Sequence, residues 1–157
     1  MIPTIIIFTI LSLDQFTKFI VSTNLSFHQS VPVIPGVFHL TFVHNRGAAF
    51  GILKNQTLLF ISTSFLAVIL IFFALRDSRH KRLYSCALSL ILGGALGNLI
   101  DRLCFGYVID FLDFRVWPVF NIADSAITVG AILLGWSMLR NPKSQIPNPK
   151  QIQNDKS

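Results

Sequence analysis

Four long apolar stretches constrain the fold of this 157-residue chain more than any other feature. They cover Pro3–Val21, Thr57–Leu75, Leu83–Ile100 and Val119–Leu139. A helix needs about 20 apolar residues to cross the hydrocarbon core of a bilayer, and each stretch comes close to that length. Only 13% of the residues are charged, against about 25% in a typical soluble domain. The sequence therefore predicts a membrane all-α fold, a four-transmembrane-helix bundle.

The first apolar stretch could be mistaken for a cleavable leader. It lacks a basic segment at its start, and no small-x-small cleavage site follows it, so we interpret it as a retained span.

The distribution of basic residues predicts the orientation. Four spans place both ends of the chain on one side, and eight of the 13 Lys and Arg residues lie in the link 76–82 or after residue 139. The positive-inside rule makes that side cytoplasmic. We therefore expect a membrane domain over residues 1–140 and a disordered cytoplasmic tail over 141–157. The net charge of +6 then reflects contact with membrane lipids, and no basic–aromatic pattern indicates nucleic-acid binding.

The segments on the other side are expected to include a small extracytoplasmic β platform, over about residues 22–56. Phe38–Val43 alternates apolar and polar residues as a strand does. Pro32, Pro35 and Gly36 interrupt the chain before it. We interpret His39 and His44, on this strand and at its end, as surface residues.

Polar residues in the predicted spans all fall toward the outer end. A charge at the centre of a membrane helix costs about 2.5–3.5 kcal/mol on insertion scales, so each is a candidate for function. The chain has no glutamate, and its seven acidic residues are all aspartates. The residues at this level are Asp14, Lys18, Asn98, Asp101, Arg102, Asn121, Asp124 and Ser125.

Most of these residues also have a structural interpretation. Asp14 and Lys18 are four residues apart and can neutralise each other on one helical face, which favours structural support over ligand contact. Arg102 could reach lipid headgroups or serve a site, and Asp101 is expected to pair locally. The small residues of Gly93–Gly97 are typical of close helix packing.

Asp124 is the strongest candidate for function. It lies among apolar residues, about 7–8 Å along the predicted helix from Val119, although an aspartate there could instead cap the helix. Asp110 is expected in the preceding outer loop, flanked by apolar residues, and Asp113 is expected to be solvated. If Asp110 and Asp124 meet, they share a proton and titrate as a pair. Such a pair can activate water and protonate a leaving amine, which is aspartic proteolysis without a cofactor.

Other chemistries find no support in the residue pattern. The four histidines and two cysteines have no metal-ligand spacing, and Ser125 has no partner base in sequence, so we expect neither a metal site nor a serine mechanism. Cys86 and Cys104 would lie roughly 27 Å apart on one helix, too far for a disulfide.

Five sequence blocks, in order along the chain, resemble the lipoprotein signal peptidase (signal peptidase II) family. They cover nearly the whole chain, and only the tail has no counterpart. The blocks are Asp14–Lys18, Asn45–Gly51, Gly93–Arg102, Gly106–Phe111 and Phe120–Asp124.

The resemblance implies an aspartic endopeptidase of the bacterial inner membrane, with its active site near the outer face. Its substrate would be a prolipoprotein carrying diacylglycerol on a cysteine, and cleavage would fall just before that cysteine. Inhibition by the cyclic peptide globomycin is implied as well, and we expect a monomer without a cofactor.

The resemblance also assigns roles to individual residues. Asp110 and Asp124 would be catalytic, and Asp14 and Lys18 would brace the fold. The residues that would bind substrate or support the site are Asn45, Gly47, Asn98, Arg102, Asn121 and Ala123.

Two other functions remain open on the residues alone. A small transporter or channel subunit would place its polar residues near the bilayer midplane, whereas here they gather toward one leaflet. A structural membrane subunit would leave two aspartates without a task. The discriminating observation is whether Asp124→Asn abolishes activity while the protein still accumulates in the membrane. Loss of accumulation would instead favour a structural role.

Overall fold

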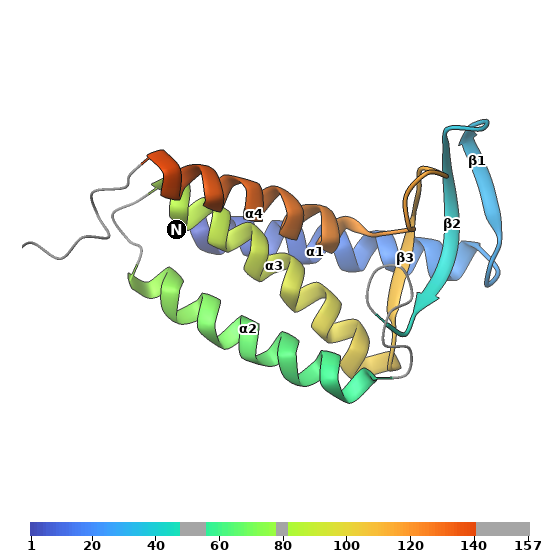
Figure 1. The fold of residues 1–157 in the computed structure, drawn as a ribbon. Helices are drawn as coiled ribbons and strands as arrows, with labels where there is room; N and C mark the ends of the chain where they lie inside the picture. The colour runs from blue at the N-terminus through green and yellow to red at the C-terminus, as the bar shows by residue number, and fades with distance from the viewer. Residues whose placement is uncertain (48–55, 78–81, 141–157) are drawn as a thin grey trace, which may run out of the picture.

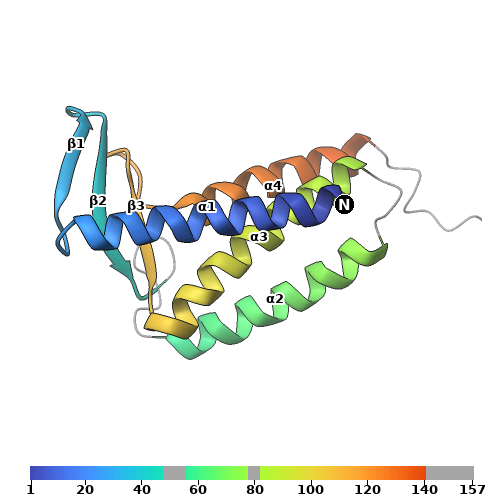
Figure 2. The ribbon, with the colours of Figure 1, turned by 180° about the vertical axis from the view of Figure 1, so that it is seen from behind.

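The computed structural model describes residues 1–47, 56–77 and 82–140. Four helices form a bundle with a small sheet across one end (Figures 1 and 2). The helices are α1 (Ile2–Asn24), α2 (Thr57–Asp77), α3 (Arg82–Phe105) and α4 (Ile122–Arg140), and the strands are β1 (Ser30–Ile34), β2 (Phe38–Asn45) and β3 (Val108–Asp113). Each helix is long and apolar enough to cross a membrane, which confirms the predicted fold class. The predicted disordered tail lies outside the described residues.

Helix α3 is the centre of the bundle. It packs against the other three helices, and its small residues allow two of them to approach closely. A Cβ atom on Gly94 would overlap the carbonyl of Ala123 on α4, and one on Gly97 would lie 2.5 Å from Asp14 Oδ2 on α1. The predicted packing role of Gly93–Gly97 is therefore confirmed. By contrast, no side chain of α2 between Leu58 and Asp77 is buried.

The sheet is antiparallel, in the order β1-β2-β3. The strand predicted at Phe38–Val43 is present as β2 and runs on to Asn45. Strand β3 was not predicted, because Val108–Leu112 is buried almost throughout and therefore lacks the alternation of a half-exposed strand. The platform thus extends beyond the predicted segment 22–56. Val21 of α1 packs against three residues of the sheet, which are Phe42, Ile109 and Phe111.

Several residue-level predictions about the sheet were wrong. Asp110 lies on β3, not in a loop. Asp113 is buried, not solvated, and accepts a hydrogen bond of 2.7 Å from the Thr41 hydroxyl. His39 and His44 are partly buried, and the His44 ring stacks between Phe27 and Tyr107 at centroid distances of 4.4 and 3.8 Å.

Candidate active site

The polar side chains expected at one level come together where the sheet meets the bundle. At this end α1 and α3 finish, β3 crosses, and α4 begins (Figures 1 and 2). Because these elements lie far apart in the sequence, side-chain hydrogen bonds join them across up to 109 positions. The site therefore depends on tertiary packing.

Asn121 is the residue that links Asp110 and Asp124. Its amide Nδ2 donates to Asp110 Oδ1 at 2.7 Å, and its Oδ1 accepts from the backbone N–H of Asp124 at 2.9 Å. In return, Asp124 Oδ2 accepts from the Asn121 backbone N–H at 3.4 Å. This reciprocal pair is a capping box, which satisfies donors at a helix start. One side chain therefore fixes the start of α4 and contacts both acids.

Asp110 is held by neutral amide donors. Its side chain is 1% exposed, and Asn45 Nδ2 donates to its Oδ2 at 2.9 Å, opposite the bond from Asn121. Burial raises the pKa of Asp110 to about 7, and the nearby negative charge of Asp124 contributes to the rise. Asp110 can therefore hold a proton near neutral pH.

Asp124 lies at the first turn of α4, because that helix begins at Ile122 and not at Val119 as predicted. Asn121 consequently precedes the helix. Asn98 Nδ2 donates to Asp124 Oδ1 at 2.8 Å, and the aligned peptide dipoles at a helix start also favour a negative charge. The capping interpretation and the functional interpretation of Asp124 are thus compatible.

A second acidic cluster lies beside the first and contains a cation. Lys18 Nζ lies 2.8 Å from Asp14 Oδ2 and 2.8 Å from Asp101 Oδ2, and donates to Asn98 Oδ1 at 3.0 Å. The prediction that Asp14 and Lys18 pair is confirmed. The prediction that Asp101 pairs only locally was wrong, since its partner Lys18 is on another helix.

The cluster around Lys18 positions both candidate acids. Asp14 Oδ1 accepts the backbone N–H of Ala123, next to Asp124, at 2.9 Å. Asp101 Oδ2 accepts the backbone N–H of Ile109, next to Asp110, at 3.0 Å.

Gln15 belongs to this network and was missed from the sequence. Its Nε2 donates to Asp101 Oδ1 at 2.9 Å and also contacts Gly97 O and Asp14 Oδ2, both at 3.2 Å. The signal was present, since a glutamine inside an apolar span needs polar partners.

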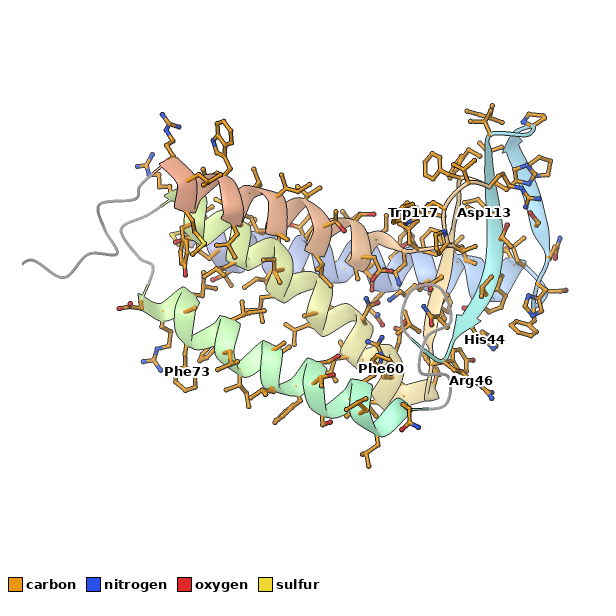
Figure 3. All side chains as sticks on the ribbon, viewed as in Figure 1. His44, Arg46, Phe60, Phe73, Asp113 and Trp117 are labelled. Carbon is orange, nitrogen blue, oxygen red and sulfur yellow. The ribbon has the colours of Figure 1, made fainter. Side chains whose placement is uncertain are left out.

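Arg102 lies at the side of the site that faces α2. Its guanidinium lies 5.4 Å from the ring centroid of Phe60, and the charges of Asp124, Asp110 and Asp101 act on it. This surrounding favours a role in the site over contact with lipid headgroups. Figure 3 labels Phe60 at the end of α2 nearest the sheet.

Two further candidate residues, Gly47 and Ser125, form hydrogen bonds with asparagines of the site. The backbone N–H of Gly47 donates to Asn45 Oδ1 at 3.0 Å, which orients the amide that holds Asp110. Ser125 Oγ donates to the carbonyl of Asn121. Within the described ranges, no group of three His, Cys, Asp or Glu residues could hold a metal ion.

Comparisons with known proteins agree on one family. The model of the family described as Signal peptidase (SPase) II matches residues 6–140. A lipoprotein signal peptidase of Moorella thermoacetica is 53% identical over 83% of this chain and 87% of that protein. One of Caldanaerobacter subterraneus subsp. tengcongensis is 49% identical over 86% and 94%. A solved structure of a bacterial membrane enzyme superposes with a TM-score of 0.84 at 34% identity, covering 93% of this chain and 92% of the other.

Proposed function

The chain belongs to the signal peptidase II family, and from that premise we propose that Asp110 and Asp124 are its catalytic pair. The protein is a peptidase that removes signal peptides from prolipoproteins, as its curated relatives are named to do. The aspartic type of catalysis and the roles of individual residues are the content of the proposal.

One observation carries this proposal: Asn121 contacts both carboxyl groups, and the side chains that donate to them are neutral amides. No lysine or arginine within the described residues forms an ion pair with either acid. Two neighbouring carboxyl groups at low dielectric cannot both ionise cheaply, so they retain one proton between them. A shared proton is what acid–base hydrolysis of a peptide bond requires.

The geometry supports different starting roles for the two acids. Asp110, with a pKa of about 7, begins protonated and donates to the carbonyl oxygen of the scissile bond. Asp124, whose charge is stabilised by Asn98 and the start of α4, accepts a proton from water as the water oxygen attacks the carbonyl carbon. Asp124 then returns that proton to the leaving amine, while Asp110 recovers its own from the tetrahedral intermediate. The cycle needs no cofactor.

The other residues support substrate and acids. The two carboxyl groups are oriented by the side chains of Asn45, Asn98 and Asn121. Gly47 in turn orients the Asn45 amide. Arg102, on whose guanidinium the charges of both acids act, binds substrate carbonyl groups. Asp14 and Lys18 brace the helices, and Ala123 provides the backbone N–H that Asp14 anchors.

Substrate and location follow the family resemblance. The substrate is a prolipoprotein with diacylglycerol on its cysteine, cleaved just before that residue at the outer face of the bacterial inner membrane. Both termini are cytoplasmic, the protein acts as a monomer among membrane lipids, and globomycin occupies the site. The transporter alternative is not favoured, because the curated relatives are named as peptidases.

The test is cleavage of a diacylglyceryl-modified prolipoprotein by purified protein in detergent. Wild type is compared with Asp110→Asn and Asp124→Asn at equal amounts of folded protein. We expect wild type to cut before the lipidated cysteine and both variants to be inactive. A variant that keeps near-normal activity would refute the catalytic pair, and a wild type that cuts only the unmodified precursor would refute the substrate.

A further inference from the structure

The loop after β3 and the tip of the β1–β2 hairpin expose apolar side chains at the same end of the strands (Figures 1 and 2). Val116 is 92% exposed and Trp117 is 61% exposed, and Val37 and Phe114 are exposed as well. We call these four residues the apolar overhang. Exposed apolar side chains gathered outside the helices can mark a binding surface.

The overhang has a defined shape. The Arg115 backbone N–H donates to Asp113 Oδ1 at 2.8 Å, and the Val116 N–H donates to the Phe114 carbonyl at 2.7 Å. The Phe114 ring lies 4.9 Å from the Phe38 ring of β2 and 5.9 Å from the Phe120 ring that precedes α4. Little further ordering is therefore needed when the overhang meets a partner.

Its height along the bundle points to the bilayer surface. Helix α4 has 19 residues, which rise about 28 Å and match the hydrocarbon thickness of about 30 Å. Trp117, five residues before this helix, therefore falls at headgroup level, where tryptophan is enriched. The loop and hairpin tip stand out sideways past α4 (Figures 1 and 2), and Trp117 lies on the helix side of the sheet (Figure 3).

We propose that the apolar overhang is a membrane anchor, which inserts into the lipid leaflet beside the start of α4. It continues the apolar surface of α4, where Val129, Ile132 and Trp136 are exposed and face lipid if the helix spans the membrane. The half-exposed Arg115 guanidinium lies within the same loop, 3.2 Å from Asp113 Oδ2. Its exposed part can meet lipid phosphates, which favours lipid over a second copy of the chain.

The anchor has a consequence for the site. Strand β3 carries Asp110 and leads directly into the overhang. Contact between the overhang and lipid therefore holds Asp110 at a fixed height above the hydrocarbon core. A substrate bond presented at the membrane surface would then meet the site at a constant depth.

The test uses the fact that the chain has two tryptophans, Trp117 and Trp136. A Trp136→Phe variant leaves Trp117 as the single reporter. It is placed in vesicles of phosphatidylcholine and phosphatidylglycerol, with some acyl chains brominated near the headgroup or near the methyl end. We expect blue-shifted Trp117 emission, quenched more by the shallow bromines than by the deep ones. The Trp117→Phe variant reports a helix position in the same vesicles.

Two valine variants in the Trp136→Phe background sharpen the result. Val116→Asp places a charge in the overhang, and we expect red-shifted emission and a loss of quenching. Val33→Asp changes a similarly apolar, 53% exposed residue on β1, which β2 separates from β3 in the sheet. It should change neither the emission nor the quenching. Helical circular dichroism confirms folding.

Trp117 emission typical of a tryptophan in water, without quenching by either brominated lipid, would overturn the proposal of a membrane anchor. Emission that is shielded only at high protein density would assign the overhang to contact between copies, and would overturn it as well. Both outcomes can be read from the Trp136→Phe protein, even if Val116→Asp fails to fold.

Discussion

Two acidic clusters lie side by side in this protein and differ in what surrounds their negative charge. Asp14 and Asp101 both contact the Lys18 ammonium, whereas Asp110 and Asp124 are held by asparagine amides. A cation within contact distance holds carboxylates in place, so we interpret the first cluster as a brace. Neutral amides position acids without supplying a positive charge at contact distance, so we expect the second cluster to retain an exchangeable proton. Two similar acid pairs can therefore differ in function because of one neighbouring lysine.

Substitutions can test the difference between the two clusters, and the largest expected effect is on the cleavage rate. Asp124→Asn should reduce the cleavage rate roughly 10⁴-fold or more, because it removes the proposed general base, with little change in stability. Asp14→Asn should instead lower stability, because it weakens the contact with Lys18. Cleavage rate per folded molecule and thermal unfolding in detergent distinguish the two. An Asp14→Asn protein that is stable but inactive would contradict the division into brace and catalytic pair.

Removing the cation tests the brace directly. Lys18→Met leaves Asp14 and Asp101 buried without their partner, and removing one member of a buried ion pair costs about 3–5 kcal/mol. The free energy of unfolding, measured by denaturant titration in micelles, should fall by that amount. Adding Asp101→Asn should recover part of the loss, since the two residues interact directly. Additive losses would show that the contact is energetically unimportant.

A smaller effect is expected where α3 packs against the brace. A methyl group at Gly97 would meet Asp14 Oδ2 at 2.5 Å, and overpacking of this kind costs about 1–3 kcal/mol. The matched control is Gly135→Ala at an exposed position of α4, where no atom outside the neighbouring helical backbone lies within 4 Å of the added carbon. There we expect no loss, or a gain of up to about 1 kcal/mol from helix propensity. Equal unfolding temperatures for the two variants would argue against tight packing at Gly97.

The last effect is spread gradually over about three pH units and concerns the amide-held pair. Because the pKa of Asp110 is about 7 when folded and near 3.8 in a free side chain, the folded state binds more protons between these values. The stability that Asp110 contributes is thus present at low pH and lost as pH rises to about 7, by at most about 1.4 kcal/mol per pH unit. Asp110→Asn should remove this slope. The measurement is unfolding free energy against pH for both proteins, and parallel curves would mean that Asp110 does not hold the proton.

The membrane spans, and the position of their polar residues toward the outer end, could be predicted because both depend on local sequence patterns. A run of apolar residues predicts a span without knowledge of its neighbours, and an aspartate within such a run must find a partner. Strand β3 could not be predicted, because burial on both faces removes the alternation that reveals a strand. Gln15 and Asp101 were undervalued for a related reason, since their partners lie more than 80 positions away in sequence.

The sequence by itself determined the membrane architecture, the family, and which acids are candidates, because hydrophobic length and motif order are properties of the chain. Only the tertiary structure decided which acid has which neighbour. Asp101 and Asp110 are nine positions apart, yet one contacts a lysine from α1 and the other an asparagine from the start of α4. These contacts depend on α1, α3, α4 and β3 converging at one end of the bundle. The electrostatic surroundings that distinguish the lysine-bound acids from the amide-held acids therefore arise from packing and not from local sequence.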